Sequence, residues 1–383
     1  MKKILFFPLL RMPSGHHQVA DTIAGYLQRR DSTILCKKID LMSAWNPTVE
    51  RIVTNTYLEW IHYFPRNYAW VYKHMANKSN TGRSYKYYDF LFMKKMKQII
   101  AEEKPDLIVC THGFPSYFLS QLKSKHQCPI PVINVYTDFF INDVWGREGI
   151  DYHFVPSQAV KNNLMNRNGI PDNQIIVTGI PTDEQFEKQL TPLEATSKIK
   201  VLVSGGSVGL GNIAELLKQQ SNESEVEYFV LCGKNKKLYQ KIENLHYQNI
   251  HPLPYISSRE KMNELYSNVD AIITKPGGVT ISEALKKGQP IFIHSALPGQ
   301  EEINLKLLKE LNLVQILKEN LSLDDQVMNY FKDETVKDQF QASLQAYLRE
   351  IKGGSPNEIA TFIQDVIDFN REDALKGSAR KIN

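Results

Sequence analysis

Residues 271–284 have the sequence AIITKPGGVTISEA, and this stretch decides the fold class of the protein. The apolar and β-branched run from Ala271 to Thr274 predicts a short buried strand. Gly277 and Gly278 follow in a loop, and a predicted helix begins after them. The order of strand, glycine loop and helix is the repeating unit of a parallel α/β sheet.

The same alternation continues in both directions along the chain. Helical periodicity recurs between the strands, for example with Val19, Ile23 and Leu27 on one face. The other short β-rich runs are Lys3–Phe7, Leu107–Cys110, Val132–Tyr136, Ile175–Thr178, Val201–Ser204, Tyr228–Leu231 and Pro290–His294. Strands that alternate with helices predict parallel sheets with right-handed crossovers, and therefore an α/β protein.

The alternation is interrupted by polar residues and Pro192 between Lys188 and Lys198. We therefore expect two α/β domains, residues 1–190 and 198–355, followed by a C-terminal helix and tail at 356–383. Ligands of open parallel sheets bind beyond the carboxyl ends of the strands. The expected site is consequently the cleft between the two domains.

Composition excludes several classes of protein. The 383 residues carry 46 basic and 42 acidic side chains, and a net charge of +4 argues against a whole-surface nucleic-acid binder. No apolar run approaches the roughly 18 to 20 residues of a membrane span, and the opening segment lacks the cleavage site of a signal peptide. The four cysteines contain no C-x-x-C pair, which argues against a disulfide framework and a zinc site. We expect a cytoplasmic protein.

Two adjacent histidines, His16 and His17, begin the helix that follows the first predicted strand. A neutral imidazole with a pKa near 6.5 suits a general base that removes a proton from an acceptor hydroxyl. The alternative interpretation is that one histidine only caps or packs at the start of the helix.

A second glycine-rich loop, Ser204 to Asn212, follows the strand that ends at Ser204. Glycines allow the backbone to approach a ligand, and the positive end of the next helix favours phosphate. Gly209 to Ala214 also fits the dinucleotide fingerprint G-x-G-x-x-A, but the end of the next strand reads Leu231-Cys232-Gly233-Lys234, without the required acidic residue. Nicotinamide binding is therefore disfavoured, and a glycine turn without a ligand remains the alternative.

Polar residues also surround the glycine loop at Gly277 and Gly278. Thr280 and Glu283 fit a T-x-x-E capping box, which would explain both residues as structural. The Glu283 carboxylate is equally suited to accept two hydrogen bonds from a ribose diol. Further along, the segment Leu297 to Asn304 presents amide and carboxylate groups that suit sugar hydroxyls, although a solvated helix cap would explain them too.

These segments together resemble the monogalactosyldiacylglycerol synthase and processive diacylglycerol glucosyltransferase family. The resemblance covers nearly the whole chain, and the combination of T-K-P-G-G-x-T-x-x-E-A with P-G-Q-E-x-x-N is specific. The matching segments are Ser14–His16, Thr137–Asp138, Thr178–Pro181, Ser204–Asn212, Cys232–Asn235, Thr274–Glu283 and Pro298–Asn304. The resemblance implies a GT-B fold, with two Rossmann-like parallel-sheet domains facing across a cleft and a C-terminal helix that packs back towards the first domain.

The resemblance also implies roles for individual residues. His16 is the candidate base and Asp138 its candidate partner, although Pro13-Ser14-Gly15-His16 replaces the glycine-rich turn of many relatives. Glu283 would hold the ribose, and the backbone at Ile256 would contact the uracil edge. The remaining donor-binding candidates are Gly205, Gly206, Ser207, Gly277, Gly278 and Thr280 for the diphosphate, and Gln300, Glu301 and Asn304 for the sugar.

The charges suggest how such an enzyme would work. The leaving nucleotide diphosphate gains negative charge, which backbone amides and helix N-termini stabilise without a metal. We therefore expect no metal and no cofactor beyond the UDP-sugar co-substrate. Deprotonation of the incoming hydroxyl by His16 on the opposite face of the sugar gives a single inverting displacement.

Residues 43–98 are rich in basic and aromatic side chains. They hold nine Lys or Arg residues against three acidic ones, and three of the four tryptophans. This composition suits the headgroup layer of an anionic membrane, and the expected contacts are Trp60, Arg66, Trp70 and Lys73. Packing on the first sheet and stacking on single-stranded nucleic acid are the alternatives. The lipid acceptor that the resemblance implies favours the membrane.

The leading hypothesis is an inverting glycosyltransferase that moves a hexose from UDP-glucose or UDP-galactose to diacylglycerol or a glycolipid. It would act at the inner face of the cell membrane, as a peripheral protein without a nucleic-acid partner. The alternatives are a transferase to another lipid-linked acceptor such as a peptidoglycan precursor, a soluble UDP-sugar epimerase, and a non-catalytic UDP-sugar sensor.

Overall fold

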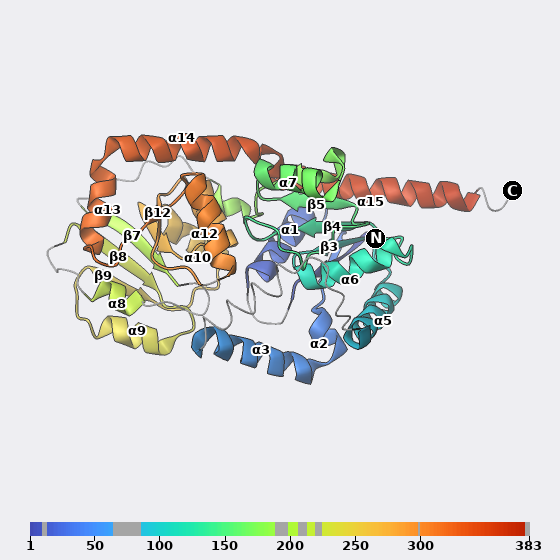
Figure 1. Cartoon of the computed structure of the whole chain (residues 1–383), viewed down its shortest axis with the longest axis horizontal. Helices are drawn as coiled ribbons and strands as arrows, with labels where there is room; N and C mark the ends of the chain where they lie inside the picture. Colours follow the sequence, from blue (N-terminus) through green and yellow to red (C-terminus); the bar gives the residue numbers. More distant parts are fainter. Residues whose placement is uncertain are drawn as a thin grey trace. The chain divides into compact units, whose positions relative to one another are not determined.

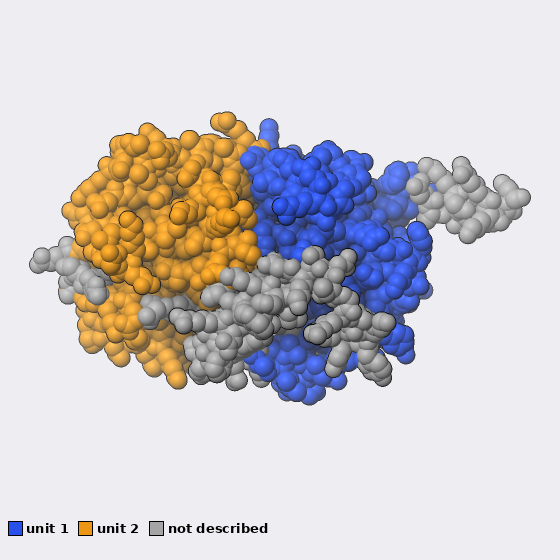
Figure 2. Space-filling model, viewed as in Figure 1, with its two compact units in different colours: residues 1–181, 350–383 blue, residues 182–349 orange. Residues whose placement is uncertain are grey.

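The computed structural model describes residues 1–9, 14–63, 86–187, 198–205, 213–218, 224–297 and 299–379, without the side chains of residues 55, 57–63, 86–89 and 373–379 (Figure 1). The chain divides into two compact units. Unit 1 comprises Met1–Pro181 with Glu350–Asn383, and unit 2 comprises Thr182–Arg349 (Figure 2). The segment expected to separate the domains, Lys188 to Lys198, lies outside the described residues except for Lys198.

Unit 1 is built on a six-stranded sheet with the order β2-β1-β3-β4-β5-β6, in which every pair of neighbours is parallel. Its strands are β1 (Lys3–Phe7), β2 (Leu35–Lys38), β3 (Leu107–Cys110), β4 (Val132–Val135), β5 (Tyr152–Val155) and β6 (Ile175–Val177). Its α-helices are α1 (Gly15–Arg30), α2 (Leu41–Trp45), α3 (Pro47–Tyr63), α5 (Lys86–Glu103), α6 (Gly113–Ser124), α7 (Gln158–Asn168) and α15 (Pro356–Ala379).

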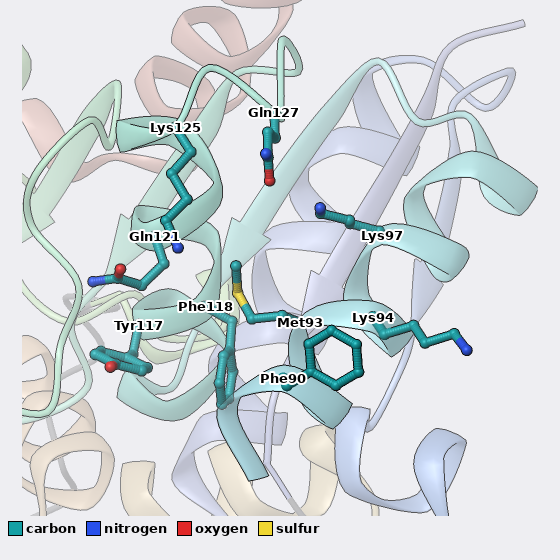
Figure 3. Close-up of a pocket in the computed structure, with 9 residues that line it drawn as sticks. All are labelled: Phe90, Met93, Lys94, Lys97, Tyr117, Phe118, Gln121, Lys125 and Gln127. Atoms are coloured by element: carbon teal, nitrogen blue, oxygen red, sulfur yellow. The ribbon is translucent and has the colours of Figure 1, made fainter. Parts of the chain in front are cut away.

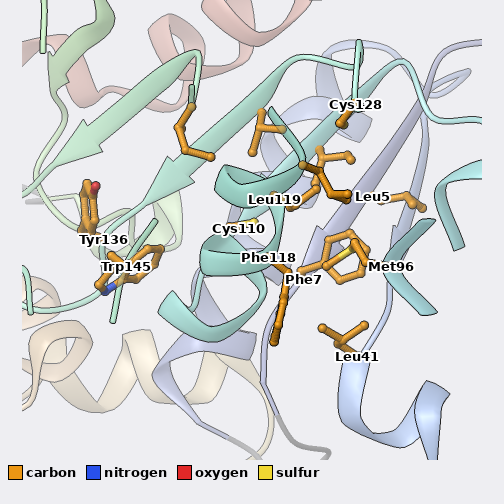
Figure 4. Packing of buried hydrophobic residues seen from close by; sticks show 14 of the residues in the cluster. Leu5, Phe7, Leu41, Met96, Cys110, Phe118, Leu119, Cys128, Tyr136 and Trp145 are labelled. Carbon is orange, nitrogen blue, oxygen red and sulfur yellow. The ribbon is translucent and has the colours of Figure 1, made fainter. Parts of the chain in front are cut away.

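One hydrophobic core of unit 1 lies between the sheet and the helices α5 and α6 (Figure 4). Leu5 and Phe7 from β1 are fully buried there, as are Met96 from α5 and Leu119 from α6. Full burial of one such side chain stabilises a fold by about 1.5–3 kcal/mol. This packing fixes the carboxyl ends of β1 and β3.

The C-terminal helix α15 completes unit 1. It packs against α1, and Arg30 of α1 donates a hydrogen bond of 2.8 Å from Nε to Gln364 Oε1. Near its end, Arg371 Nε pairs with Asp106 Oδ1 at 2.8 Å. The helix α15 is thereby joined to α1 and to Asp106, the residue before β3.

A short 3₁₀ helix, Lys352–Gly354, leads into α15 and supplies a test of this junction. A Cβ added at Gly354 would lie 1.8 Å from the carbonyl oxygen of Thr178, a backbone atom that cannot rotate away. We expect Gly354→Ala to lower the free energy of unfolding by about 1–3 kcal/mol, measured by urea denaturation. Gly353→Ala is the matched control, because its Cβ would lie 3.6 Å from the nearest atom, an ordinary contact. Equal stability of the two variants would contradict this packing.

Unit 2 is also a six-stranded parallel sheet, with the order β12-β11-β10-β7-β8-β9. Its strands are β7 (Ile199–Ser204), β8 (Val226–Leu231), β9 (Ile250–Leu253), β10 (Ala271–Thr274), β11 (Ile291–Ile293) and β12 (Gln315–Ile316). Its α-helices are α8 (Ile213–Leu217), α9 (Lys236–Glu243), α10 (Arg259–Ser267), α11 (Gly278–Lys287), α12 (Gln300–Glu310), α13 (Leu323–Lys332) and α14 (Glu334–Glu350).

The predicted α/β class is confirmed, since both sheets are parallel and strands alternate with helices. The prediction omitted four strands, which are β2, β9 and β12 at sheet edges and β5 inside the sheet of unit 1. β9 contains Pro252, and an edge strand tolerates proline because one side of its backbone is not paired. Within the described part of the chain, the helices are all too short or too polar to cross a bilayer.

Candidate active site

Each sheet has one place where the direction of chain crossover reverses. In unit 1 it lies between β1 and β3, because β2 is on one side of β1 and the later strands are on the other. In unit 2 it lies between β7 and β10. Loops diverge at such a switch point, and open α/β sheets bind their ligands there, beyond the carboxyl ends of the strands. The two switch points therefore locate a candidate site in each unit.

His16 lies in the first turn of α1, beside the switch point of unit 1. Its Nδ1 is 2.8 Å from the carbonyl oxygen of Thr111 and 2.8 Å from Oγ1 of Thr137. Because a carbonyl oxygen only accepts hydrogen bonds, the Nδ1 atom carries the proton of the neutral ring. The lone pair is consequently on Nε2, as a general base requires.

Burial lowers the pKa of His16 below its usual value of 6.5, and the charge of Asp138 and the hydrogen bond to Thr111 oppose this effect. The net shift is downward, so the ring is neutral at pH 7. The charge of Asp138 raises the pKa of His16, which is the effect expected of a partner of the base. Their catalytic roles remain predictions.

His112 is a neighbour of His16 that the sequence analysis missed. The two rings meet edge to face, with centroids 4.6 Å apart and an interplanar angle of 83°. His112 is the N-cap of α6, where its Nδ1 accepts a hydrogen bond of 3.0 Å from the backbone N–H of Phe114. Burial lowers the pKa of His112 well below 6.5, and His16 lowers it further. His112 lies two residues after the end of β3, and a polar residue so close to a buried strand was the available signal.

The predicted glycine loop leads into α11 in unit 2. The helix begins at Gly278 with Gly277 as its N-cap, and no side chain caps it. The capping-box interpretation of Thr280 and Glu283 is therefore wrong, because the helix starts before Thr280 and places Glu283 in its second turn. A glycine cap leaves the backbone N–H groups of the first turn clear of a capping side chain, which suits phosphate binding.

Glu283 is only 4% exposed and faces α10. Its Oε1 lies 3.5 Å from Nη1 of Arg259, and its Oε2 accepts a hydrogen bond of 3.3 Å from the hydroxyl of Tyr266. Burial and the neighbouring Glu283 raise the pKa of Tyr266, which therefore remains a donor. Both of these contacts are long for hydrogen bonds. Neither partner was predicted from the sequence.

The predicted sugar-contacting residues lie at the start of α12. Asn304 is 1% exposed, and its Nδ2 donates a hydrogen bond of 3.1 Å to the carbonyl oxygen of Pro276, which joins α12 to the glycine loop. Glu301 Oε2 accepts a hydrogen bond of 2.6 Å from the backbone N–H of Leu297. Glu301 thus has a local structural role, and Gln300 is the first residue of the helix.

A buried cation follows β10 and was not predicted. Lys275 is 7% exposed; burial lowers its pKa, and the charge of Glu301 raises it. His294 follows β11, and burial together with Lys275 lowers its pKa to about 4. The His294 Nε2 atom is buried without a hydrogen-bond partner among the described residues. Lys275 and His294 are both polar residues that directly follow a buried strand, and this pattern in the sequence could have identified them.

The other predicted residues are placed as follows. Gly205 is buried directly after β7, beside the switch point of unit 2, and Ile256 is half-buried in the loop between β9 and α10. Gly206, Ser207, Arg66, Trp70 and Lys73 lie outside the described residues, and the side chain of Trp60 is not described.

Known proteins resemble the chain over most of its length. Residues 16–182 match the family model of monogalactosyldiacylglycerol (MGDG) synthase, and residues 200–350 match the glycosyltransferase family 28 C-terminal domain. The uncharacterized glycosyltransferase YkoN of Bacillus subtilis (strain 168) is 38% identical over 380 residues, which cover 98% of this chain and 100% of that protein. A processive diacylglycerol beta-glucosyltransferase of Bacillus cereus (strain G9842) is 29% identical over 351 residues, which cover 89% of each chain.

Solved structures share the fold. The crystal structure of Acinetobacter baumannii MurG matches with a TM-score of 0.55 and 15% sequence identity, and the match covers 97% of this chain and 100% of that chain. The two parallel six-stranded sheets and this similarity identify a GT-B architecture, as predicted. The chain therefore belongs to the glycosyltransferase family of monogalactosyldiacylglycerol synthases and processive diacylglycerol glucosyltransferases.

Proposed function

We propose that the protein is an inverting glycosyltransferase that moves a hexose from UDP-glucose or UDP-galactose to diacylglycerol or a glycolipid. The chemistry needs a base for the acceptor and a phosphate-binding helix for the donor. The imidazole of His16 lies at the switch point of unit 1, and the glycine-capped helix α11, with the Glu283 carboxylate, lies at the switch point of unit 2. This placement is the observation that carries the proposal. Relatives named as processive diacylglycerol beta-glucosyltransferases support the lipid acceptor.

The donor would bind at the switch point of unit 2. The N-terminus of α11 and Lys275 offer positive charge to the diphosphate, and Glu283 offers acceptors to the ribose diol. As the anomeric bond breaks, the leaving diphosphate gains charge that these fixed groups stabilise, and we propose that the transfer requires no metal. Gln300 and Asn304, at the start of α12, would contact the sugar.

The acceptor would bind at the switch point of unit 1. Nε2 of His16 takes the proton of the acceptor hydroxyl while the oxygen attacks the anomeric carbon from the face opposite the leaving group. The resulting imidazolium is stabilised by the charge of Asp138, which favours the protonated ring. One displacement of this kind inverts the anomeric configuration.

We further propose that the protein acts on the inner face of the cell membrane. The basic and aromatic composition of residues 43–98 supports this location, because anionic headgroups attract lysine and arginine.

A transfer assay tests the proposed function. The protein is incubated with labelled UDP-glucose or UDP-galactose and vesicles that contain diacylglycerol, and we expect labelled glycolipid from at least one donor. If the sugar were transferred to a peptidoglycan precursor and not to diacylglycerol, the protein would be a transferase with a different lipid-linked acceptor. Release of an altered free sugar would indicate an epimerase. Absence of labelled lipid with both donors would refute the proposal.

A further inference from the structure

A short segment at the beginning of unit 2 packs against the helices of the candidate donor site. Unit 2 begins at Thr182, and a 3₁₀ helix, Glu184–Phe186, follows at once. Asp183 caps this turn, since its Oδ1 accepts a hydrogen bond of 3.1 Å from the backbone N–H of Gln185. The turn contacts both α10 and α11. It therefore lies against the helix that carries Glu283 and against the helix that Glu283 faces.

Phe186 joins this turn to the core of the unit. Its side chain is fully buried, and its ring meets the ring of Tyr266 edge to face, with centroids 5.2 Å apart and an interplanar angle of 87°. Tyr266 is 2% exposed, and its hydroxyl donates the hydrogen bond of 3.3 Å to Oε2 of Glu283. A continuous chain of contacts thus leads from Phe186 through Tyr266 to the carboxylate of Glu283.

The backbone of Tyr266 is held separately from its ring. Nε2 of Gln289 donates a hydrogen bond to the Tyr266 carbonyl oxygen and a second one, of 2.9 Å, to that of Val269. The position of the ring depends on its packing, and among the described residues Phe186 supplies the aromatic ring that meets it. A hydrogen bond of 3.3 Å is longer than usual, so a further displacement of the ring would break it. The contact with Phe186 consequently affects how firmly Tyr266 holds Glu283.

We propose that Phe186 is a positioning residue for the donor site. It fixes the ring of Tyr266, which in turn holds the Glu283 carboxylate in the orientation that binds the ribose diol. The turn at the start of unit 2 then contributes to nucleotide affinity through a neighbouring residue. This inference rests on the proposed function, in which Glu283 binds the ribose of a UDP-sugar.

Two nucleotides separate this role from a general loss of stability. UDP and 2′,3′-dideoxy-UDP are titrated into the full chain by calorimetry. We expect Phe186→Leu to weaken UDP binding about threefold to tenfold, the range of an edge-to-face aromatic contact. Its affinity for 2′,3′-dideoxy-UDP should equal that of the unmodified protein, because this ligand offers Glu283 no diol. Phe186→Met keeps more of the side-chain volume and gives the same test if the leucine variant does not fold.

Phe292→Leu is the matched control. Phe292 is 2% exposed in the same unit, and its ring meets the ring of Tyr330 edge to face, with centroids 5.4 Å apart. This variant should bind both nucleotides as the unmodified protein does. An equal loss of UDP affinity in Phe292→Leu and Phe186→Leu would overturn the proposal.

A double-mutant cycle tests whether Phe186 acts through Glu283. In the Glu283→Ala background, Phe186→Leu should weaken UDP binding no further, because the group that it positions is gone. Additive losses would overturn the proposal. So would unchanged UDP affinity in Phe186→Leu, or an equal loss for 2′,3′-dideoxy-UDP.

A pocket in unit 1 is an alternative place for an anionic nucleotide. It has a volume of about 540 Å³ and lies between α5 and α6 (Figure 3). The apolar residues Phe90, Met93 and Phe118 line it together with Lys94, Lys97 and Lys125. Lys97→Gln should leave UDP affinity unchanged. A loss in Lys97→Gln without a loss in Phe186→Leu would place UDP in unit 1 and refute both the positioning role and the proposed donor site. If neither variant lost affinity, the positioning role alone would fail, and the transfer assay would still decide the proposed function.

Discussion

His16→Ala is expected to retain its affinity for UDP and to lose turnover by a factor of about 10²–10⁴, the usual contribution of a general base. The Thr111 carbonyl holds the Nδ1–H tautomer of His16, and the substitution removes the lone pair on Nε2. Turnover is measured with labelled UDP-sugar, and UDP affinity by calorimetry. His17→Ala is the control, since it removes the adjacent histidine of the same helix turn. Near-normal turnover of His16→Ala, or an equal loss in both variants, would remove His16 from the mechanism.

The pH dependence gives an independent check of the same residue. A base works only when neutral, so activity is lost as the pH falls through the pKa of His16. Burial lowers that pKa below 6.5, and the acidic limb of kcat/KM is therefore expected below pH 6.5. Asp138 raises the pKa of His16, so Asp138→Asn should move the limb to still lower pH. A limb at or above pH 6.5, or a shift in the other direction, would contradict this assignment.

Glu283→Ala is expected to weaken UDP binding roughly 10-fold to 100-fold, because hydrogen bonds to a charged group contribute about 1.5–3 kcal/mol. The loss is measured by calorimetry. Glu264→Ala removes an exposed carboxylate from the neighbouring helix α10 and serves as the control. Circular dichroism checks the fold, since Arg259 and Tyr266 lose their partner in the Glu283 variant.

A modified ligand tests whether Glu283 contacts the ribose. The analogue 2′,3′-dideoxy-UDP lacks the diol, so the unmodified protein and Glu283→Ala should bind it with similar affinity. If Glu283→Ala weakened the binding of 2′,3′-dideoxy-UDP as much as the binding of UDP, Glu283 would act only through the packing of α10 and α11. Unchanged UDP affinity in Glu283→Ala would exclude the residue from the donor site.

Most of the fold was predictable because its signals are local. The apolar run Ala271 to Thr274 and the glycines after it specify a strand and a turn from neighbouring residues alone, and the structure has both where they were predicted. Helical periodicity in the segment of Val19, Ile23 and Leu27 likewise depends on residues a few positions apart, and α1 buries all three. Repetition of such local units was sufficient to predict parallel sheets.

The surroundings of the candidate site depended on tertiary structure. His112 follows a different strand from His16, and their rings meet only because β1 and β3 are neighbours in the sheet. Similarly, Arg259 and Tyr266 reach Glu283 from another helix. Spacing along the chain carries no information about these encounters, since strand order and helix packing set them.

The sequence alone thus determined the α/β class, the glycine loops, the histidine pair and the family resemblance, which all arise from residues near one another in the chain. The tertiary structure decided where α11 begins, which groups surround His16 and Glu283, and that two helices enclose an apolar pocket with a lysine rim. The physical reason is that chemistry between distant residues is created by packing, which brings together groups that local preferences place independently.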